Sequence, residues 1–288
     1  MGGKDLSIMS YSLDPLEFVS WQSPPEILNR TFASKIEARR ACGLVYESST
    51  FSSIFGRKGF IWRCPWWMRA GVFSLFRFSL LKNKVPKPGF MTDGRHGGML
   101  FVHIPKCGGI SIRQRLLGES HGYHRTIADY SIALGAKALA RRWKFTFVRN
   151  PFSRIASAFF YLKRGGRAEI DAVVNERILG RCRTLEDFIL MLEQNPELLS
   201  LLHFRPQWLF LINPVSFCIE MDFVGRIENL DTDLARVFAH LGMSGRPTER
   251  RNVNPSGSDY SQMYSSRMVD IVGGLYKHDL EIFRYQFA

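Results

Sequence analysis

The stretch that decides the fold runs from Phe101 to Ser111 and reads FVHIPKCGGIS. An apolar run enters a turn made of one lysine, one cysteine and two glycines, and a helical pattern of apolar residues follows. A strand, a glycine-rich loop and a helix N-terminus together bind anions, because backbone N–H groups and the helix dipole face the ligand. Lys106 adds a positive charge at the same place. The stretch therefore predicts a site for a phosphate-like anion.

The order of residues in this loop differs from that of the nucleoside triphosphatases and nucleotide kinases. Their loop reads GxxxxGK followed by Ser or Thr, so its lysine comes after the glycines. Here Lys106 precedes Gly108 and Gly109. A kinase would also need a magnesium-binding carboxylate at a strand end, and the sequence offers none there. These differences disfavour a nucleotide kinase and indicate another phosphate chemistry.

A second segment, residues 144–157, reads KFTFVRNPFSRIAS. It predicts a buried strand that ends at Arg149 and a helix that begins at Pro151, since proline suits the first helical turn. Open α/β sheets bind ligands at the carboxyl ends of their strands, where Arg149 lies. Ser157 follows on the same helix, so we expect Arg149 and Ser157 to bind one phosphate. Arg154 fits either a ligand-facing group or a surface charge.

Together the two segments resemble motifs of sulfotransferases that use 3′-phosphoadenosine 5′-phosphosulfate (PAPS). The resemblance is to family 2, the branch of carbohydrate and heparan-type enzymes, and to its bacterial-type members. His103–Ser111 resembles the family's 5′-phosphosulfate loop, and Phe145–Ser157 resembles its 3′-phosphate motif. Weaker likenesses follow in the family's order at residues 203–207, 222–230 and 276–285.

The resemblance implies a set of donor-binding residues. These are Lys106, Cys107, Gly108, Gly109, Ile110, Ser111, Arg149 and Ser157. The family often has threonine at the positions of Cys107 and Ile110. A lost hydroxyl removes a contact while the backbone amides remain, so we expect the departure to affect donor affinity more than binding mode.

Removal of a proton from the acceptor hydroxyl calls for a general base. The family commonly places its catalytic histidine in a segment that residues 122–126, GYHRT, resemble. We therefore expect His124 and Lys106 to be the catalytic residues, with an imidazole pKa near the ordinary value of about 6.5. His121 is the main alternative as the base, and without the resemblance His124 would read as an exposed loop histidine.

Two further residues are expected to contact the acceptor. His203 and Gln207 lie in an element that faces the acceptor in the family, so the resemblance gives both a substrate-binding role. His103 precedes the loop and is expected to pack or to support other groups. No metal is expected, because the five cysteines are scattered and follow no metal-binding spacing.

The chain is strongly basic, with a net charge of +13 over 288 residues. Such a charge indicates anionic partners, and nucleic acid is the first class to consider. The sequence contains no zinc-finger, homeodomain or RNA-recognition pattern, which disfavours nucleic acid. A nucleotide donor, an acidic glycan or a membrane surface fits the charge equally well.

Strand and helix patterns alternate along residues 96–288, which we expect to form the catalytic domain. The expected fold is α/β, a P-loop-like three-layer arrangement in which helices flank a central parallel sheet. We expect strands at residues 99–104, 144–149 and 217–224. We expect helices at residues 109–118, 151–163, 184–194, 228–241, 259–272 and 274–284.

Residues 1–95 are expected to form a mainly helical extension, rich in basic and aromatic residues. No Asp or Glu lies between Glu47 and Asp93, whereas eight Lys or Arg residues do. Residues 57–87 could contact an anionic membrane surface, or residues 66–81 could pack on the catalytic domain. Neither a signal segment nor a membrane span is apparent, so the expected location is the cytoplasm, with peripheral contact at the inner membrane as an option.

The resemblance implies transfer of a sulfuryl group from PAPS to an acceptor hydroxyl, with a carbohydrate or glycolipid as the expected acceptor. The alternative is a non-catalytic nucleotide-binding or membrane-associated scaffold, in which Cys107 and Ile110 mark a degenerate phosphate loop. Retention of Lys106, Arg149 and Ser157 favours the enzyme.

Overall fold

A computed structural model of the chain describes residues 98–118, 124–213, 219–243 and 260–287. The expected extension at residues 1–95 lies outside these ranges, as does its basic stretch at residues 57–87. His121 lies outside them too. The fold and the site below concern only the residues that the structure describes.

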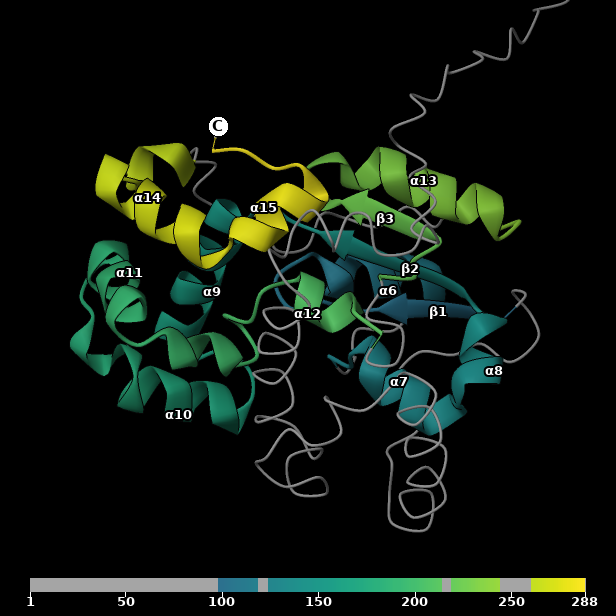
Figure 1. The fold of residues 1–288 in the computed structure, drawn as a ribbon, viewed down its shortest axis with the longest axis horizontal. Coiled ribbons are helices and arrows are strands. Elements are labelled where there is room, and N and C mark those ends of the chain that lie inside the picture. The colour runs from purple at the N-terminus through teal and green to yellow at the C-terminus, as the bar shows by residue number, and fades with distance from the viewer. Residues whose placement is uncertain (1–97, 119–123, 214–218, 244–259, 288) are drawn as a thin grey trace, which may run out of the picture.

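A three-stranded parallel sheet in the order β1–β2–β3 forms the centre of the described fold (Figure 1). Its strands are β1 (Met99–Val102), β2 (Trp143–Val148) and β3 (Phe223–Arg226). The α-helices are α6 (Gly109–Leu117), α7 (Ile127–Leu134), α8 (Ala136–Ala140), α9 (Pro151–Lys163), α10 (Glu169–Arg177), α11 (Leu185–Gln194), α12 (Trp208–Leu211), α13 (Leu230–His240), α14 (Ser266–Leu275) and α15 (Lys277–Phe283). Short 3₁₀ turns lie at Leu179–Arg181, Pro196–Ser200, Ile227–Asn229 and Tyr260–Met263.

The third strand begins later than the sequence predicted. Residues 217–224 were expected, but β3 runs from Phe223 to Arg226 and pairs with β2 from Phe145 to Val148. Ile219 instead makes an isolated antiparallel bridge with Ile212. Ile219 therefore lies outside the parallel ladder, which begins where Phe223 pairs with Phe145.

Alternating residues of the strands face two different helix layers. Phe101 and Phe147 pack with Ile112 of α6 and with Val237 of α13 in one core cluster. On the opposite face, the core contains Leu100, Val102 and Val148 together with residues of α7, α12 and α15. The central parallel sheet flanked by helices is therefore present in the described residues.

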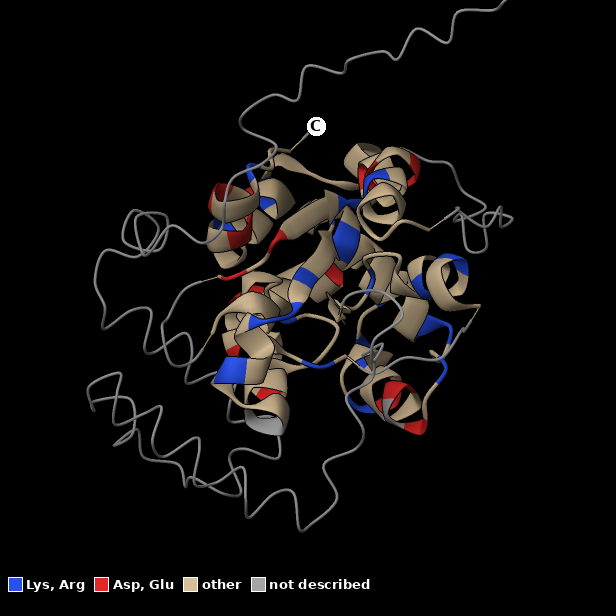
Figure 2. Ribbon diagram, turned by 90° about the vertical axis from the view of Figure 1, so that its right-hand side faces the viewer, with Lys and Arg blue, Asp and Glu red and all other residues tan. Residues whose placement is uncertain are grey.

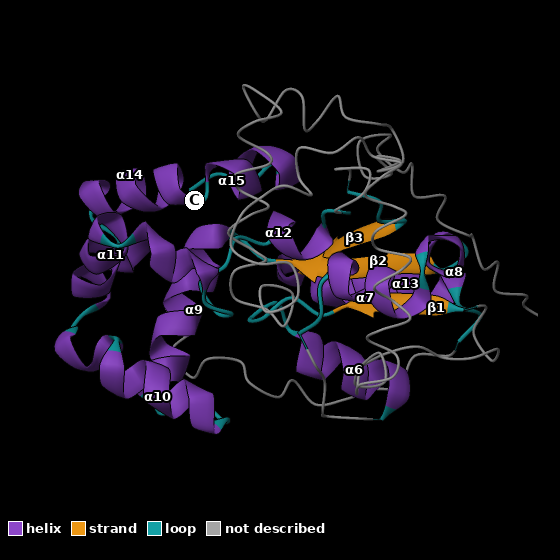
Figure 3. Cartoon of the chain, turned by 60° about the horizontal axis from the view of Figure 1, so that its bottom comes forward, coloured by secondary structure: helices purple, strands orange, loops and turns teal. Residues whose placement is uncertain are grey.

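A third core cluster joins α9, α11 and α14 beside the sheet. Figure 3 shows these helices, with α10, grouped on one side of the strands. The helix at residues 151–163 matches the prediction, and Thr184 caps α11 by accepting from the Asp187 N–H. Helices α7, α8, α10 and α12 lie outside the helices expected from the sequence. The last two helices begin several residues later than expected, at Ser266 and Lys277.

Candidate functional site

The loop between β1 and α6 has the backbone shape expected of an anion cradle. Lys106 and Gly108 both lie in the left-handed region, with φ of 68° and 70°. A lysine in that region is uncommon, and such strain tends to persist at functional sites. Gly109 begins α6, and a Cβ there would collide with the ring of His103. The glycines therefore keep the loop close to its neighbours and leave amides at the start of α6 available.

Lys106 is half-buried, and its ammonium lies over the Tyr161 ring, 3.9 Å from the ring centroid. Desolvation, followed by repulsion from Arg149, Arg164 and Arg167, lowers the pKa of Lys106 to about 8. Lys and Arg residues, blue in Figure 2, lie on inner parts of the fold as well as on outer helices. A bound anion would relieve this crowding of positive charge at the loop.

Arg149 lies at the carboxyl end of β2, as the sequence predicted, and reaches the phosphate loop. Its Nη1–H donates to the carbonyl of Lys106 at 3.3 Å, and its Nε–H donates to Ser153 Oγ at 2.9 Å. Ser157 lies one turn beyond Ser153 on the same face of α9. The structure thus brings Arg149 to Lys106 and places Ser157 on the α9 face that Arg149 contacts.

His124 lies beside the loop and is held by the strand that precedes it. Its Nδ1 is 3.0 Å from the carbonyl oxygen of His103. A carbonyl only accepts, so Nδ1 carries the proton and Nε2 keeps its lone pair. Burial lowers the pKa of His124 to about 4, which differs from the ordinary value expected from the sequence. His124 is therefore neutral at neutral pH, with Nε2 able to accept a proton.

Three histidines from distant parts of the chain gather at this point. The ring centroids of His103 and His124 are 4.2 Å apart, and those of His124 and His203 are 6.4 Å apart. Desolvation also lowers the pKa of His103 well below its usual value. His203, expected to contact the acceptor, thus lies next to His124, and its ring centroid is 5.3 Å from that of Tyr161, the ring under the Lys106 ammonium.

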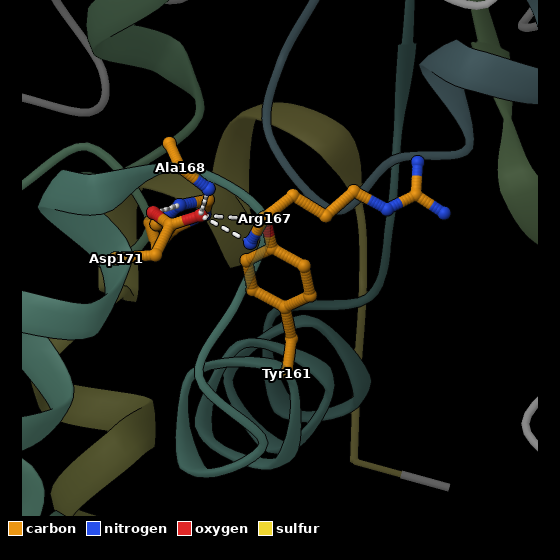
Figure 4. Close-up of polar contacts among 5 residues, drawn as sticks. Tyr161, Arg167, Ala168 and Asp171 are labelled. Carbon is orange, nitrogen blue, oxygen red and sulfur yellow. Dashed lines mark hydrogen bonds and ion pairs between the residues drawn. The ribbon is translucent and has the colours of Figure 1, made fainter.

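Asp171 on α10 connects several of these groups (Figure 4). One carboxylate oxygen accepts from Tyr161 OH at 2.6 Å and from the N–H groups of Arg167 and Ala168 at 3.0 and 3.1 Å. The other oxygen lies 3.0 Å from His203 Nε2. Burial by itself would raise the pKa of Asp171, but these hydrogen bonds lower it to about 2. The group is therefore a carboxylate at neutral pH.

Gln207 does not have the place that the sequence predicted for it. Its side chain is fully buried, at 0% exposure, so an acceptor cannot reach it directly. Its carbonyl oxygen accepts from Arg149 N–H at 2.9 Å and from Cys107 Sγ at 3.2 Å, and its amide donates to the Arg149 carbonyl at 2.8 Å. Gln207 instead joins the phosphate loop to the end of β2.

Cys107 helps to hold the loop in place through its buried hydrogen bond to Gln207. Burial raises the pKa of its thiol to about 12, so it is a neutral thiol at neutral pH. Ile110, the other departure from the family, is half-buried at the first turn of α6. The loop therefore keeps an internal hydrogen bond at the Cys107 position.

Arg154 is neither ligand-facing nor a surface charge, the two options that the sequence left open. It is 1% exposed, and it donates to the carbonyls of Pro105 at 3.0 Å and Arg205 at 2.9 Å. It therefore ties the phosphate loop to the segment that contains His203.

Sequence reasoning missed Tyr161 and Asp171 in this site. The only sequence signal was local: an acidic residue soon after Gly165-Gly166, which suits the start of a helix. Nothing in that pattern indicates contact with His203, which lies 32 positions further along the chain. The packing of α10 beside α9 brings Asp171 to Tyr161.

Within the described ranges, no helix is long and apolar enough to cross a membrane. No group of three or more His, Cys, Asp or Glu in these ranges is arranged to hold a metal ion.

Comparison with known proteins gives one match. The family model described as "Sulfotransferase family" matches residues 88–286. No curated protein and no solved structure matches the chain.

Proposed function

The chain belongs to the sulfotransferase family, and from this premise we propose that it moves a sulfuryl group from PAPS to an acceptor hydroxyl. The observation that carries this proposal is the contact between its two phosphate motifs. Arg149 Nη1–H donates to the carbonyl of Lys106 at 3.3 Å, although the residues are 43 positions apart. Two cationic side chains and the start of α6 thereby converge on one place.

The residues present fit a donor that carries two anionic groups. In the part of the chain that the structure describes, Arg149 makes no ion pair with a carboxylate, and its Nε and Nη1 bond Ser153 and a carbonyl. Lys106 and the α6 amides would hold the 5′-phosphosulfate, and Arg149 with Ser157 would hold the 3′-phosphate. When bound, PAPS supplies the sulfuryl group, and its bisphosphate nucleotide leaves with the electron pair of the broken sulfur–oxygen bond.

Lys106 has the clearest chemical task. Sulfuryl transfer resembles phosphoryl transfer, where positioning and charge stabilisation account for most of the catalysis. A positive side chain at the loop stabilises charge that develops on the leaving phosphate. Contact with the Tyr161 ring and the left-handed backbone keep the Lys106 ammonium at the loop before any ligand binds.

His124 is the proposed base. Its Nδ1–H is fixed on the carbonyl of His103, so Nε2 presents the lone pair. The proton of the acceptor hydroxyl would pass to Nε2 as the acceptor oxygen bonds to sulfur. We propose that His203 contacts the acceptor beside it, since the two rings lie 6.4 Å apart.

The acceptor class and the location are also proposals. We infer a hydroxyl of a carbohydrate or glycolipid, since the resembled branch acts on sugars and the net charge of +13 suits an anionic glycan. We propose residues 96–288 as the catalytic domain, in a cytoplasmic protein. Peripheral membrane contact would come from residues 57–87, whose run of basic residues has no acidic neighbour.

The test has two arms. Calorimetric titration with 3′,5′-bisphosphoadenosine measures donor-site binding, and transfer of labelled sulfate from PAPS to a panel of glycans, glycolipids and phenols measures activity. We expect binding and labelling of a sugar acceptor. Binding without labelling of any acceptor would support a non-catalytic nucleotide-binding scaffold. Absence of binding would refute the assignment of the phosphate motifs.

A further inference from the structure

Asp171 is more enclosed and more heavily bonded than a helix cap requires. Its residue is 4% exposed, and both carboxylate oxygens accept hydrogen bonds, from Tyr161, His203 and two backbone amides. A cap needs only the amides at the start of the helix. The two side-chain partners therefore point to a second task.

Each side-chain partner of Asp171 contacts one of the two proposed catalytic residues, Lys106 or His124. Tyr161 donates its OH to Asp171 and presents its ring to the Lys106 ammonium, 3.9 Å from the centroid. His203 bonds Asp171 through Nε2, and its ring lies edge-on to that of His124. Asp171 is thus one side chain away from both the phosphate-loop lysine and the proposed base.

The hydrogen bond also sets the tautomer of His203. An ionised carboxylate only accepts, so Nε2 of His203 carries the proton and Nδ1 has the lone pair. Nδ1 is buried without a hydrogen-bond partner in the described structure. The carboxylate of Asp171 fixes the tautomer and the ring orientation of His203, as carboxylates do for other histidines. Without it, His203 would no longer be held in the Nε2–H form.

Asp171 is also the acidic group that acts on three titratable side chains of the site. Its charge raises the pKa of Lys106, His124 and His203, against the larger effect of desolvation, which lowers all three. The other charged groups that act on these side chains are cationic or become so: Lys106, Arg149, Arg154, Arg164, Arg167 and His203. A site so rich in positive charge disfavours the further positive charge that His124 gains when it accepts a proton.

We propose that Asp171 is a positioning residue and counter-charge of the transfer site, holding His203 in its Nε2–H form, Tyr161 under Lys106, and stabilising the imidazolium that forms on His124. The proposal rests on the proposed function for its catalytic part. A base as desolvated as His124 gains a proton only if negative charge lies nearby. Asp171 supplies that charge without occupying the place of the acceptor.

The chain offers a matched control for the cap. Asp187 occupies the same position on α11, where its carboxylate accepts from the N–H groups of Arg183 at 2.7 Å and Thr184 at 2.9 Å. Asp171→Asn and Asp187→Asn both weaken a helix start. Only Asp171→Asn also alters the hydrogen bonds to Tyr161 and His203. If Asp171 were only a helix cap, the two variants would behave alike.

The first experiment compares kcat/KM against pH for the wild type and both variants. With Asp171→Asn we expect kcat to fall about 10²-fold, and both limbs of the profile to move to lower pH. The direction follows because removal of a negative charge lowers the pKa of Lys106 and of His124. Asp187→Asn should leave the profile in place. Equal profiles for the two variants would overturn the proposal.

The second experiment needs no turnover. Nitrogen-15 NMR of protein labelled at histidine and lysine, with His203 assigned by His203→Gln and Lys106 by Lys106→Ala, reports the tautomer of His203 and the titration of Lys106. We expect the Nε2–H form in the wild type, and a lowered Lys106 pKa in Asp171→Asn. An Nδ1–H form in the wild type would overturn the proposal, even if the variant fails to fold. Failed sulfate transfer with the expected spectra would reject the proposed function and leave the positioning role standing.

Discussion

At the scale of single residues, Lys106 combines three constraints. Its backbone is left-handed with φ of 68°, its ammonium lies over Tyr161, and desolvation lowers its pKa to about 8. The left-handed backbone and the desolvated charge cost stability in a protein without a ligand, whereas the Tyr161 contact offsets part of that cost. A bound anion at the loop would offset the electrostatic part, and this fits a residue kept for ligand binding and not for folding.

Lys106→Ala tests this role directly. We expect turnover to fall by about 10²–10³-fold, the usual effect of losing one group that stabilises transition-state charge. Affinity for 3′,5′-bisphosphoadenosine should fall less. Lys137→Ala on α8 serves as the control, because Lys137 is exposed and lies outside the site. Near-wild-type transfer by Lys106→Ala would show that the loop has another role.

The pH dependence of kcat/KM follows from two of the same side chains. Lys106 must be charged, so activity should fall as pH rises through its pKa of about 8. His124 must be neutral, so activity should fall as pH drops through its pKa of about 4. His124→Ala should remove the acidic limb, lower the rate by about 10²–10⁴-fold and spare nucleotide binding. An acidic limb that survives His124→Ala would assign the base to His121 or His203.

At the scale of elements, β2 and α9 present the proposed 3′-phosphate site as one unit. Asn150 caps α9 by accepting from Phe152 N–H at 3.1 Å, and its own N–H donates to Glu228 Oε1 at 2.7 Å. These contacts fix the direction in which α9 leaves the strand. Arg149 and Ser157 are therefore held at a fixed distance and orientation to each other, which a bidentate phosphate contact requires.

Nucleotides with and without a 3′-phosphate test this unit. Arg149→Ala should weaken 3′,5′-bisphosphoadenosine by about 10–100-fold, since a charged hydrogen bond contributes roughly 1.5–3 kcal/mol. Adenosine 5′-phosphosulfate, which lacks the 3′-phosphate, should lose much less affinity. Ser157→Ala should show the same selectivity with a smaller loss. Calorimetry measures both, and equal losses for the two nucleotides would contradict the assignment.

At the scale of the whole molecule, buried hydrogen bonds connect the C-terminal helices to the site. Asp279 on α15 is fully buried and accepts from the N–H groups of Gln207 at 2.8 Å and Trp208 at 2.9 Å. Gln207 in turn holds Arg149 and Cys107. Helix α15 thus supports the phosphate loop through Gln207.

Asp279→Ala should therefore reduce both stability and activity. It leaves buried amides of Gln207 and Trp208 unpaired, at a cost of about 1–3 kcal/mol each, which lowers Tm by roughly 5–10 °C. Asp270→Ala on the exposed face of α14 is the control and should change Tm little. A thermal melt checks both variants. An unchanged Tm for Asp279→Ala would mean that these hydrogen bonds are replaced by water.

Local patterns in the sequence were enough to predict those helices and strands whose bounds are set by neighbouring residues. The first two strands, α6 and α9 lie close to their predicted bounds, because alternating apolar residues, Pro151 and the loop glycines act within a few residues of one another. The same local information placed Lys106 and Arg149 at strand ends. Bounds shifted where a partner from another part of the chain decided the pairing, as for β3, whose Phe223 pairs with Phe145 of β2.

Only the tertiary structure decided which side chains meet. Asp171 and His203 are 32 residues apart in the chain and form a hydrogen bond. Gln207, which the sequence had assigned to the acceptor, is fully buried. Burial also moved the pKa of His124 to about 4. The physical reason is that contact and desolvation depend on how distant segments pack, whereas the motif residues carry their chemistry and local backbone preferences in the sequence itself.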